Sequence, residues 1–204
     1  MPAKPQTEPD LQIEDSMPQN LVAGIDEAGR GPWAGPVCAA AVILNRDSIP
    51  DGLNDSKKLS EKRREVLFDM ITQSAIVGVG FASVAEIDEI NILSATYLAM
   101  ERAVAALDPQ PEAVIIDGNR APQGLPMPSQ TIVKGDARSL SIAAASIIAK
   151  VSRDRVMKKL AEEFPAYGWH KNKGYGTAAH RVSLLSHGVT PHHRRSFRPV
   201  HNML

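Results

Sequence analysis

Four short apolar stretches and a short fifth run, QTIVK, lie between residues 21 and 134, and charged or turn-forming residues end each of them. They span 21–26, 36–44, 76–82, 112–117 and 130–134. Continuous apolar runs of this length, rich in Val, Ile and Ala, are typical of strands that are buried inside a sheet. The pattern therefore predicts five strands.

Three longer segments, 61–74, 84–107 and 139–163, repeat their apolar residues at the spacing of a helix. The residues expected to face the core are Val66, Leu67, Met70 and Ile71 in the first segment, Ile87, Ile90, Leu93, Leu98, Ala99 and Val104 in the second, and Ile142, Ile147, Ile148, Val151, Val156 and Leu160 in the third. Ser60 suits the N-cap of the first helix, and Thr177 suits the N-cap of a last helix that would end at Gly188. This order of elements predicts an α/β architecture, in which a mixed sheet is covered by helical layers.

The chain divides into a polar N-terminal segment and one domain. Residues 1–20 are rich in Pro, Gln, Glu and Asp, and we expect a flexible tail there. Residues 21–204 contain no repeat and no linker, so they are expected to form a single domain. A 43% apolar and 23% charged composition is that of a soluble globular protein.

Targeting and redox signals point to the cytoplasm. No run approaches the roughly 20 apolar residues of a membrane span, and the N-terminus lacks the apolar core of a secretory signal. The one cysteine, Cys38, can form neither an intramolecular disulfide nor a zinc site by itself. A reducing cytoplasm and no membrane partner are therefore our expectations, and a monomer is the default oligomeric state.

The formal net charge is zero, but the charge is unevenly distributed along the chain. Residues 1–149 contain 12 basic and 20 acidic residues, whereas residues 150–204 contain 11 basic and 3 acidic residues and all six histidines. A basic C-terminal region is a candidate surface for a phosphate backbone. A solvated helical face followed by a charged C-terminus explains the same asymmetry, and charge alone favours that simpler interpretation.

Carboxylates follow three of the predicted strands. Asp26 and Glu27 end the first strand, Asp117 ends the fourth, and Asp136 comes shortly after the fifth. Neighbouring residues on a strand point to opposite faces, so Asp26 and Glu27 share a site only if the strand ends or bends there. Carboxylates that converge at one sheet edge repel each other unless a cation lies among them, and hard divalent ions prefer oxygen ligands. The four acids thus predict a Mg²⁺-type site for phosphoryl chemistry, although acidic turns after strands are also common.

Other motifs are weaker signals. Gly29 and Gly31 permit a close approach of the backbone to a ligand, but their spacing matches neither a P-loop nor a dinucleotide fingerprint. Lys57 and Lys58 are either solvated or in contact with phosphate. Tyr175 lies between two glycines, where it could stack on a sugar or anchor a loop to the core. The segment 192–195, His-His-Arg-Arg, is a candidate for phosphate contacts rather than for metal binding.

Together the motifs resemble a known family. GIDEAGRGPWAGPV, LNDSKKLS, EIDEINIL, VIIDGN, VKGDARSLSIAAASIIAKVSRD, KNKGYGT and HHRRSF occur in this order over about residues 21–199. They are similar to those of bacterial type 2 ribonuclease H, the ribonuclease HII family. The resemblance implies the ribonuclease H-like fold, with a mixed five-stranded sheet flanked by helices and a helical C-terminal region.

The resemblance also implies an activity. Members cleave the RNA strand of RNA–DNA hybrids, and they cut duplex DNA on the 5′ side of an embedded ribonucleotide. Motif by motif, Asp26, Glu27, Asp117 and Asp136 would hold two Mg²⁺ or Mn²⁺ ions, and the products would carry 3′-hydroxyl and 5′-phosphate ends. The motif Gly29, Arg30 and Gly31 would recognise the 2′-hydroxyl at the RNA–DNA junction together with Tyr175. Candidate contacts to the phosphate backbone are Lys57, Lys58, Lys173, Arg194 and Arg195.

Two details separate this chain from type 3 enzymes. The fourth acid is Asp136, where type 3 enzymes have a glutamate, and only about twenty polar residues precede the first strand, where type 3 enzymes add a substrate-binding domain. Asp154 is expected to have a structural role, with Arg153 or Arg155 as its partner.

Two other classes of function compete with this hypothesis. A nucleic-acid-binding module without catalysis would use the basic region but would leave the carboxylates unexplained. A small-molecule phosphotransferase built on the glycine loop, residues Gly29–Gly31, would need a nucleotide fingerprint, which the sequence lacks.

Overall fold

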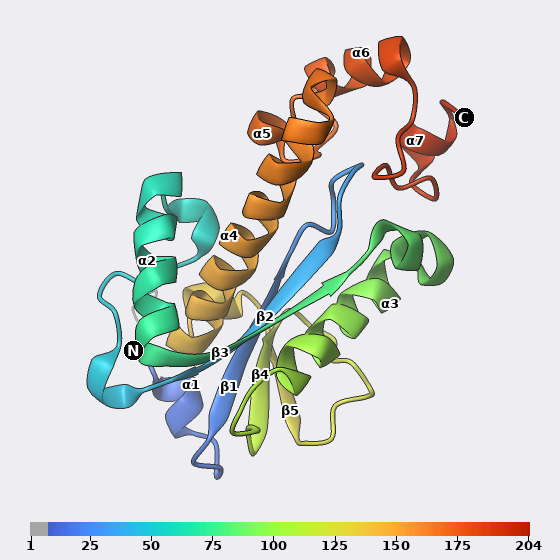
Figure 1. Cartoon of the computed structure of the whole chain (residues 1–204). Helices are drawn as coiled ribbons and strands as arrows, with labels where there is room; N and C mark the ends of the chain where they lie inside the picture. The colour runs from blue at the N-terminus through green and yellow to red at the C-terminus, as the bar shows by residue number, and fades with distance from the viewer. Residues whose placement is uncertain (1–7) are drawn as a thin grey trace, which may run out of the picture.

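The computed structural model describes residues 8–204, which fold around one five-stranded sheet (Figure 1). The strands are β1 (Val22–Ala28), β2 (Val37–Leu44), β3 (Ala75–Ala82), β4 (Ala113–Asp117) and β5 (Ser129–Ile132), in the order β3-β2-β1-β4-β5. β1 pairs antiparallel with β2 and parallel with β4, β2 pairs antiparallel with β3, and β4 pairs parallel with β5. All five predicted strands and the mixed sheet are confirmed.

The described part of the chain also contains seven α-helices. They are α1 (Gln12–Asp15), α2 (Glu61–Ser74), α3 (Val84–Ala105), α4 (Leu140–Glu163), α5 (Trp169–Asn172), α6 (Ala178–His187) and α7 (Arg198–His201). Of these, α5, α6 and α7 lie beyond the end of the sheet (Figure 1). Short 3₁₀ helices lie at Arg46–Ser48 (η1), Ser56–Lys58 (η2), Gly135–Ala137 (η3) and Pro165–Tyr167 (η4). Between residues 8 and 204, no helix has the length and apolar character needed to cross a membrane.

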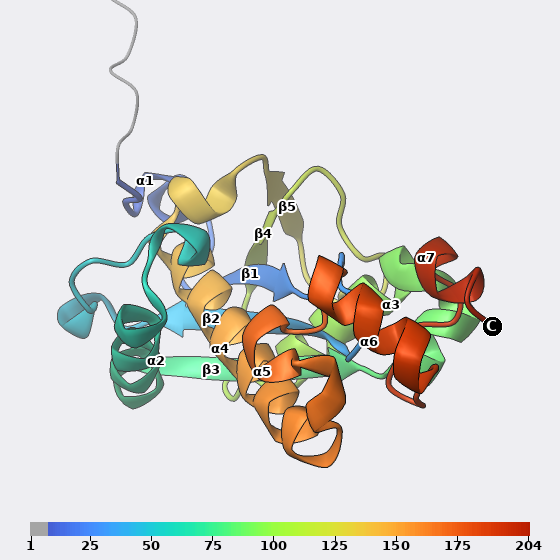
Figure 2. The same cartoon turned by 90° about the horizontal axis from the view of Figure 1, so that it is seen from above.

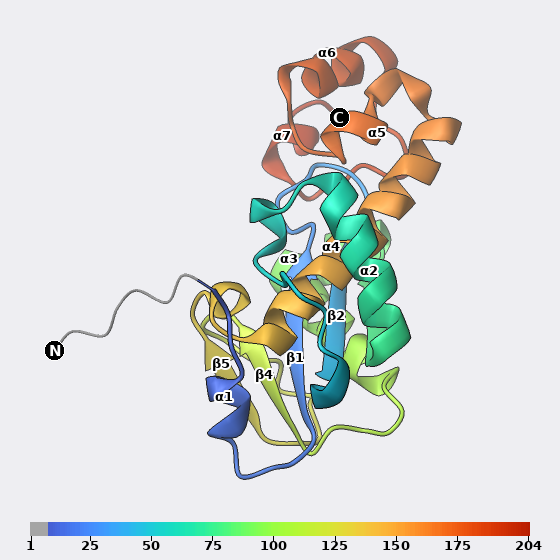
Figure 3. The same ribbon diagram turned by 90° about the vertical axis from the view of Figure 1, so that its left-hand side faces the viewer.

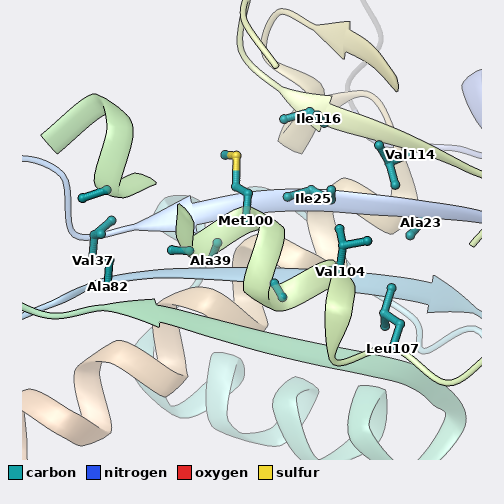
Figure 4. Close-up of a cluster of buried hydrophobic side chains, with 14 of the residues drawn as sticks. Ala23, Ile25, Val37, Ala39, Ala82, Met100, Val104, Leu107, Val114 and Ile116 are labelled. Atoms are coloured by element: carbon teal, nitrogen blue, oxygen red, sulfur yellow. The ribbon is translucent and has the colours of Figure 1, made fainter. Parts of the chain in front are cut away.

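Alternation along the strands divides the core into two layers. Ala23 and Ile25 of β1 point toward α3, where Met100 and Val104 cover them (Figure 4). Gly24, between them, faces α4 and is so close to this helix that a Cβ atom there would lie 2.2 Å from the carbonyl carbon of Ser141. The side chains of β1 are therefore divided between two helical layers.

Helix α4 joins the sheet to the C-terminal helices. Its first half packs on β1 and β2, and its second half extends beyond the sheet to α5, as Figures 2 and 3 show. The loop after β1 rises to the same region, where Ala34 forms a bridge with His193 and the Trp33 amide donates to the Gly174 carbonyl at 2.8 Å (Figure 1). Residues that are distant in sequence thus meet above the end of β1.

The helix ends follow the local sequence. Ser60 and Thr177 accept hydrogen bonds from the amides of Arg63 and His180, so they cap α2 and α6 as predicted. Helix α3 contains a kink at Asn91, whose φ is 67° and whose side chain accepts hydrogen bonds from the amides of Leu93 and Ser94. The kink replaces the continuous helix that the apolar spacing predicted.

Two expectations about packing are wrong. Leu67 and Ile71 of α2 are buried, but Val66 and Met70 are exposed, because α2 contacts the rest of the protein along a narrower stripe than four apolar residues would fill. The strand predicted to reach residue 134 ends at Ile132, and Val133 is exposed.

The N-terminal segment also differs from its prediction. Residues 1–7 of the expected tail lie outside the described residues, but Asp10 to Met17 pack on the domain. The Asp10 carbonyl accepts from the Leu140 amide at 3.0 Å, and buried Glu14 accepts from the Ser141 amide and from the hydroxyls of Ser139 and Ser141. A flexible tail up to residue 20 is thus wrong for this stretch, because Glu14 satisfies donors at the start of α4.

Candidate active site

Three aspartates converge at one end of the sheet. Asp26 on β1 and Asp117 at the end of β4 lie on the α4 side of two parallel, hydrogen-bonded strands. Asp136 belongs to η3, the turn that leads into α4. One carboxylate oxygen from each of the three lies within 4.8 Å of the others. The parallel pairing of β1 and β4 places two of these acids together, and the turn before α4 adds the third.

Local hydrogen bonds hold this arrangement. The Gly135 amide donates to Asp117 Oδ1 at 2.7 Å, which ties η3 to the end of β4. The Glu27 amide donates to Asp26 Oδ1 at 2.7 Å. Each of these aspartates thus uses one carboxylate oxygen to accept from the backbone, and the second oxygen is left for other partners.

Glu27 lies apart from the three aspartates. β1 continues through Ala28, which pairs with Cys38, so the strand does not end before Glu27 as convergence of both acids requires. Glu27 therefore projects from the α3 side of the sheet, and Arg30 Nη1 lies 3.4 Å from its Oε1. Of the four carboxylates expected at one centre, the structure groups three and leaves Glu27 at the border of the cluster.

Burial and crowding raise the pKa values of the acids. Burial, followed by the neighbouring Glu27 and Asp117 carboxylates, raises the pKa of Asp26 well above its usual range. Burial and Asp117 also raise the pKa of Asp136. Burial raises the pKa of Glu27, although Arg30 opposes the shift. Burial is therefore the main cause of the raised pKa values, and repulsion between neighbouring carboxylates adds to it for Asp26 and Asp136.

Lys57 is the cation beside the cluster. Its Nζ lies 3.7 Å from Asp136 Oδ2 and 4.0 Å from Asp55 Oδ1, and its side chain is largely exposed. Partial burial lowers the pKa of Lys57, but the surrounding aspartates outweigh that effect and raise it. Lys58, the next residue, is exposed and its Nζ lies 3.5 Å from Asn54 Oδ1.

A cavity of about 350 Å³ opens beside the acids. It is lined by Asp26, Glu27, Ala28, Gly29, Arg30, Gly31, Ser56, Lys57, Lys150, Arg153 and Tyr175. A second cavity of about 320 Å³ lies on the other side of Glu27 and includes Asp117, Asn119 and Arg120. Glu27 and Arg30 line both cavities, so they form the wall between them.

Tyr175 is positioned at the rim of the first cavity. It is 47% exposed, and a Cβ atom added to Gly31 would lie 3.6 Å from its ring. Its carbonyl lies 2.9 Å from His180 Nδ1, and its amide donates to the Asn172 carbonyl at 2.8 Å. The ring therefore faces the cavity and is not buried in the core.

Two of the five predicted phosphate contacts are wrong. Arg194 is fully buried, and its guanidinium donates only to backbone carbonyls. Lys173 is buried, and its ammonium donates to the His170 carbonyl. Arg194 is therefore enclosed where no nucleic acid can reach it, and the ammonium of Lys173 is held against its own segment by the His170 carbonyl. Lys57, Lys58 and Arg195 are exposed.

Asp154 has a different partner from the one predicted. It is buried on α4, and Lys150 Nζ lies 2.7 Å from its Oδ1. Arg153 instead donates to three backbone carbonyls, and Arg155 pairs with Glu65 at 2.6 Å. The i, i+4 spacing of Lys150 and Asp154 is the signal that the sequence interpretation missed.

Arg153 is the other residue that the sequence interpretation missed. It lies one helical turn before buried Met157 and on the face of α4 that also carries the buried Ala149, so the helical spacing could have placed it in the interior. It touches the cavity and the glycine loop together.

The donor set of the cluster fits a hard divalent cation. Its three converging residues offer only carboxylate oxygens, which Mg²⁺ and Mn²⁺ prefer, and it contains no thiolate or imidazole. Burial first, and repulsion between the carboxylates second, raise the pKa values of Asp26 and Asp136, and a bound cation would offset the repulsion.

The family model and the similar sequences agree on one family. Residues 23–200 match the family described as Ribonuclease HII. The chain is 56% identical over 201 residues to a ribonuclease HII of Ruegeria pomeroyi, covering 97% of this chain and 86% of that protein. It is 60% identical over 186 residues to ribonuclease HII 1 of Methylibium petroleiphilum, covering 91% and 93%. The crystal structure of the ribonuclease H2 from Pyrococcus horikoshii superposes with a TM-score of 0.74 at 27% identity, covering 89% of this chain and 96% of that one.

Proposed function

Because the chain belongs to the ribonuclease HII family, whose members are metal-dependent endoribonucleases, we propose that it hydrolyses the RNA strand of RNA–DNA hybrids and cuts duplex DNA 5′ of an embedded ribonucleotide. One observation carries the proposal. Carboxylate oxygens of Asp26, Asp117 and Asp136 lie within 4.8 Å of one another, beside a cavity lined by Gly29, Gly31 and Tyr175. A centre for phosphodiester hydrolysis thus adjoins a site suited to a ribose.

The acids would hold the metal. Asp26, Asp117 and Asp136, whose carboxylate oxygens converge, together with Glu27 between the two cavities, would hold two Mg²⁺ or Mn²⁺ ions. When bound, the two ions supply activation of the attacking water and stabilisation of the leaving 3′-oxygen, which gives 3′-hydroxyl and 5′-phosphate ends. No nucleophilic side chain is required.

The other residues of the cavity would bind and orient the substrate. Backbone amides of the Gly29–Gly31 loop would donate to the 2′-hydroxyl, the group that distinguishes RNA from DNA. The Tyr175 ring would stack on the sugar at the junction, and the exposed Lys57 ammonium would bind the phosphate near Asp136. Lys58 and Arg195, both exposed, would contact the phosphate backbone farther along the duplex. We also infer a monomeric enzyme of the cytoplasm.

The test is cleavage of a DNA duplex that contains one ribonucleotide, with the position of the cut mapped. We expect the wild type to cut on the 5′ side of the ribonucleotide in Mg²⁺ and to be inactive in chelator. Asp26→Asn and Asp117→Asn should abolish cleavage and weaken Mn²⁺ binding measured by calorimetry. Asp69→Asn is the matched control, because Asp69 lies on α2 and only approaches Arg155 at 3.9 Å.

Three outcomes would contradict the proposal. Full activity in either site variant would remove that aspartate from the metal centre. Binding of the hybrid without cleavage in any divalent metal would leave a nucleic-acid-binding module instead of an enzyme of this specificity. Unchanged kinetics of Tyr175→Ala on the single-ribonucleotide duplex, with Tyr175→Phe as the conservative comparison, would remove the tyrosine from the site.

A further inference from the structure

Two buried arginines lie beneath the glycine loop. Arg153 of α4 and Arg194 are 1% and 0% exposed, and none of the ion pairs among residues 8–204 includes either of them. Burying a charge without a carboxylate partner is costly, and burial lowers the pKa of Arg194 to about 9. The compensation comes from backbone carbonyls, and almost all of them belong to one loop.

Arg194 holds the carbonyls of the loop that follows β1. Its Nη2 donates to the Gly29 carbonyl at 2.6 Å and to the Pro36 carbonyl at 3.1 Å. Its Nη1 donates to the Arg30 carbonyl at 2.9 Å, and its Nε donates to the Gly35 carbonyl at 2.9 Å. One planar side chain thus binds both ends of the loop.

Peptide geometry turns these contacts into an orientation of the amides. In a trans peptide the carbonyl of one residue and the N–H of the next point in opposite directions. Because Arg194 draws the Gly29 and Arg30 carbonyls inward, the N–H groups of Arg30 and Gly31 are directed away from the interior. Within residues 8–204 neither amide donates to another protein atom, and both residues line the cavity.

Arg153 also holds this loop, and it shares the Pro36 carbonyl with Arg194. It donates to the carbonyls of Ala34 at 3.1 Å, Pro36 at 3.0 Å and Lys173 at 3.0 Å. The last contact ties the loop to the segment that carries Tyr175. The two arginines therefore fix the relative position of the open amides and the tyrosine ring.

We propose that Arg194 is a positioning residue for ribonucleotide recognition, which orients the Arg30 and Gly31 amides toward the 2′-hydroxyl without touching the substrate. This inference rests on the proposed function. An arginine is required because its planar head carries five donors in a fixed geometry, whereas a lysine ammonium is a compact point charge that cannot reach four separated carbonyls.

The experiment measures discrimination by binding. Dissociation constants are determined for a duplex with one ribonucleotide and for the same duplex in all-DNA form, in Ca²⁺ to suppress cleavage, for the wild type and for Arg194→Lys. We expect the preference for the ribonucleotide duplex to fall about tenfold or more in the variant, because two donors lose their alignment. Binding of the all-DNA duplex and of Mn²⁺ should change less than about twofold, since neither uses the two amides. A change confined to the ribonucleotide preference distinguishes positioning from a general loss of structure.

The matched control is Arg102→Lys. Arg102 also donates to a backbone carbonyl, that of Phe81, at 2.7 Å, but it lies on α3 beside Glu86 and lines neither cavity. If Arg194→Lys shows no cooperative unfolding transition, Arg194→Gln takes its place, because it removes the buried charge and keeps a planar donor. A folded variant at Arg194 that retains the wild-type preference would overturn the inference. A wild type without any preference would instead overturn the proposed function.

Discussion

A methyl group at Gly29 probes the contact between the glycine loop and α4. Gly29 has a φ of 97°, and a Cβ atom there would lie 1.9 Å from Nε and 2.3 Å from Cδ of Arg153. Gly188 is the matched position: its φ is 77°, and no atom lies within 4 Å of the equivalent Cβ. Gly29→Ala and Gly188→Ala therefore both place an alanine at a positive φ, but only the first creates a steric overlap.

The difference in free energy of unfolding between the two variants depends on the hydrogen bonds that Arg153 would lose. A positive φ at a non-glycine residue costs about 1–3 kcal/mol at either position. At Gly29 the arginine must also move, and its three hydrogen bonds to carbonyls prevent an easy shift. Losing one hydrogen bond from a charged donor costs about 1.5–3 kcal/mol. We therefore expect Gly29→Ala to lower the free energy of unfolding by about 2 kcal/mol more than Gly188→Ala.

Urea denaturation followed by tryptophan fluorescence measures this difference, because Trp33 lies in the loop itself and Trp169 is buried in the neighbouring C-terminal helices. The comparison is valid if both variants keep the wild-type dependence of unfolding on urea concentration. Equal losses of stability, within about 0.5 kcal/mol, would refute the reasoning. They would mean that Arg153 adapts to the methyl group without losing its carbonyl partners.

Three further predictions concern the histidines, the N-terminus and the basic region. Burial lowers the pKa of His193 to about 4, so the unfolded chain takes up the proton first, and stability should fall by about 3 kcal/mol as pH drops from about 6.5 to about 4. His193→Gln should lose this part of the pH dependence in denaturation curves, and an unchanged dependence would exclude His193 as its source. Glu14→Ala should lower the free energy of unfolding by about 2–4 kcal/mol, because it leaves buried donors at the start of α4 unpaired, whereas exposed Asp15→Ala should cost under about 1 kcal/mol. Similar thermal shifts for the two would contradict the packing of α1. Arg195→Ala should weaken hybrid binding and reduce the salt slope by about one, and an unaltered slope in fluorescence titrations would show that this arginine is only solvated.

Four of the five strands were predictable because each is a local apolar run, whereas β5 is short and mostly polar. Their predicted bounds agree with the structure within about two residues, and the caps Ser60 and Thr177 agree with it as well. Packing was less predictable. The apolar spacing of α2 does not reveal how wide its buried face is, and the polar composition of residues 10–17 does not reveal that Glu14 satisfies donors that lie 125 residues or more along the chain.

In the candidate site, too, some features could be predicted from the sequence and others could not. Acids at strand ends predicted that Asp26, Asp117 and Asp136 would meet, because parallel strands end at the same edge of a sheet. The sequence could not show that β1 continues past Glu27, since that depends on pairing with β2. Nor could the basic character of the C-terminal region show which of its charges are available to a ligand.

Thus the sequence by itself determined the order of the strands and helices, the family resemblance and the acids of the candidate metal centre, since each is encoded by local patterns or by motifs. Only the tertiary structure decided the direction in which each charged side chain points. Arg194 and Arg195 are adjacent in sequence, yet one is enclosed by the carbonyls of a distant loop and the other faces solvent. The physical reason is that a guanidinium can satisfy its donors with backbone carbonyls as well as with phosphates, and the fold alone determines which of these acceptors lies within reach.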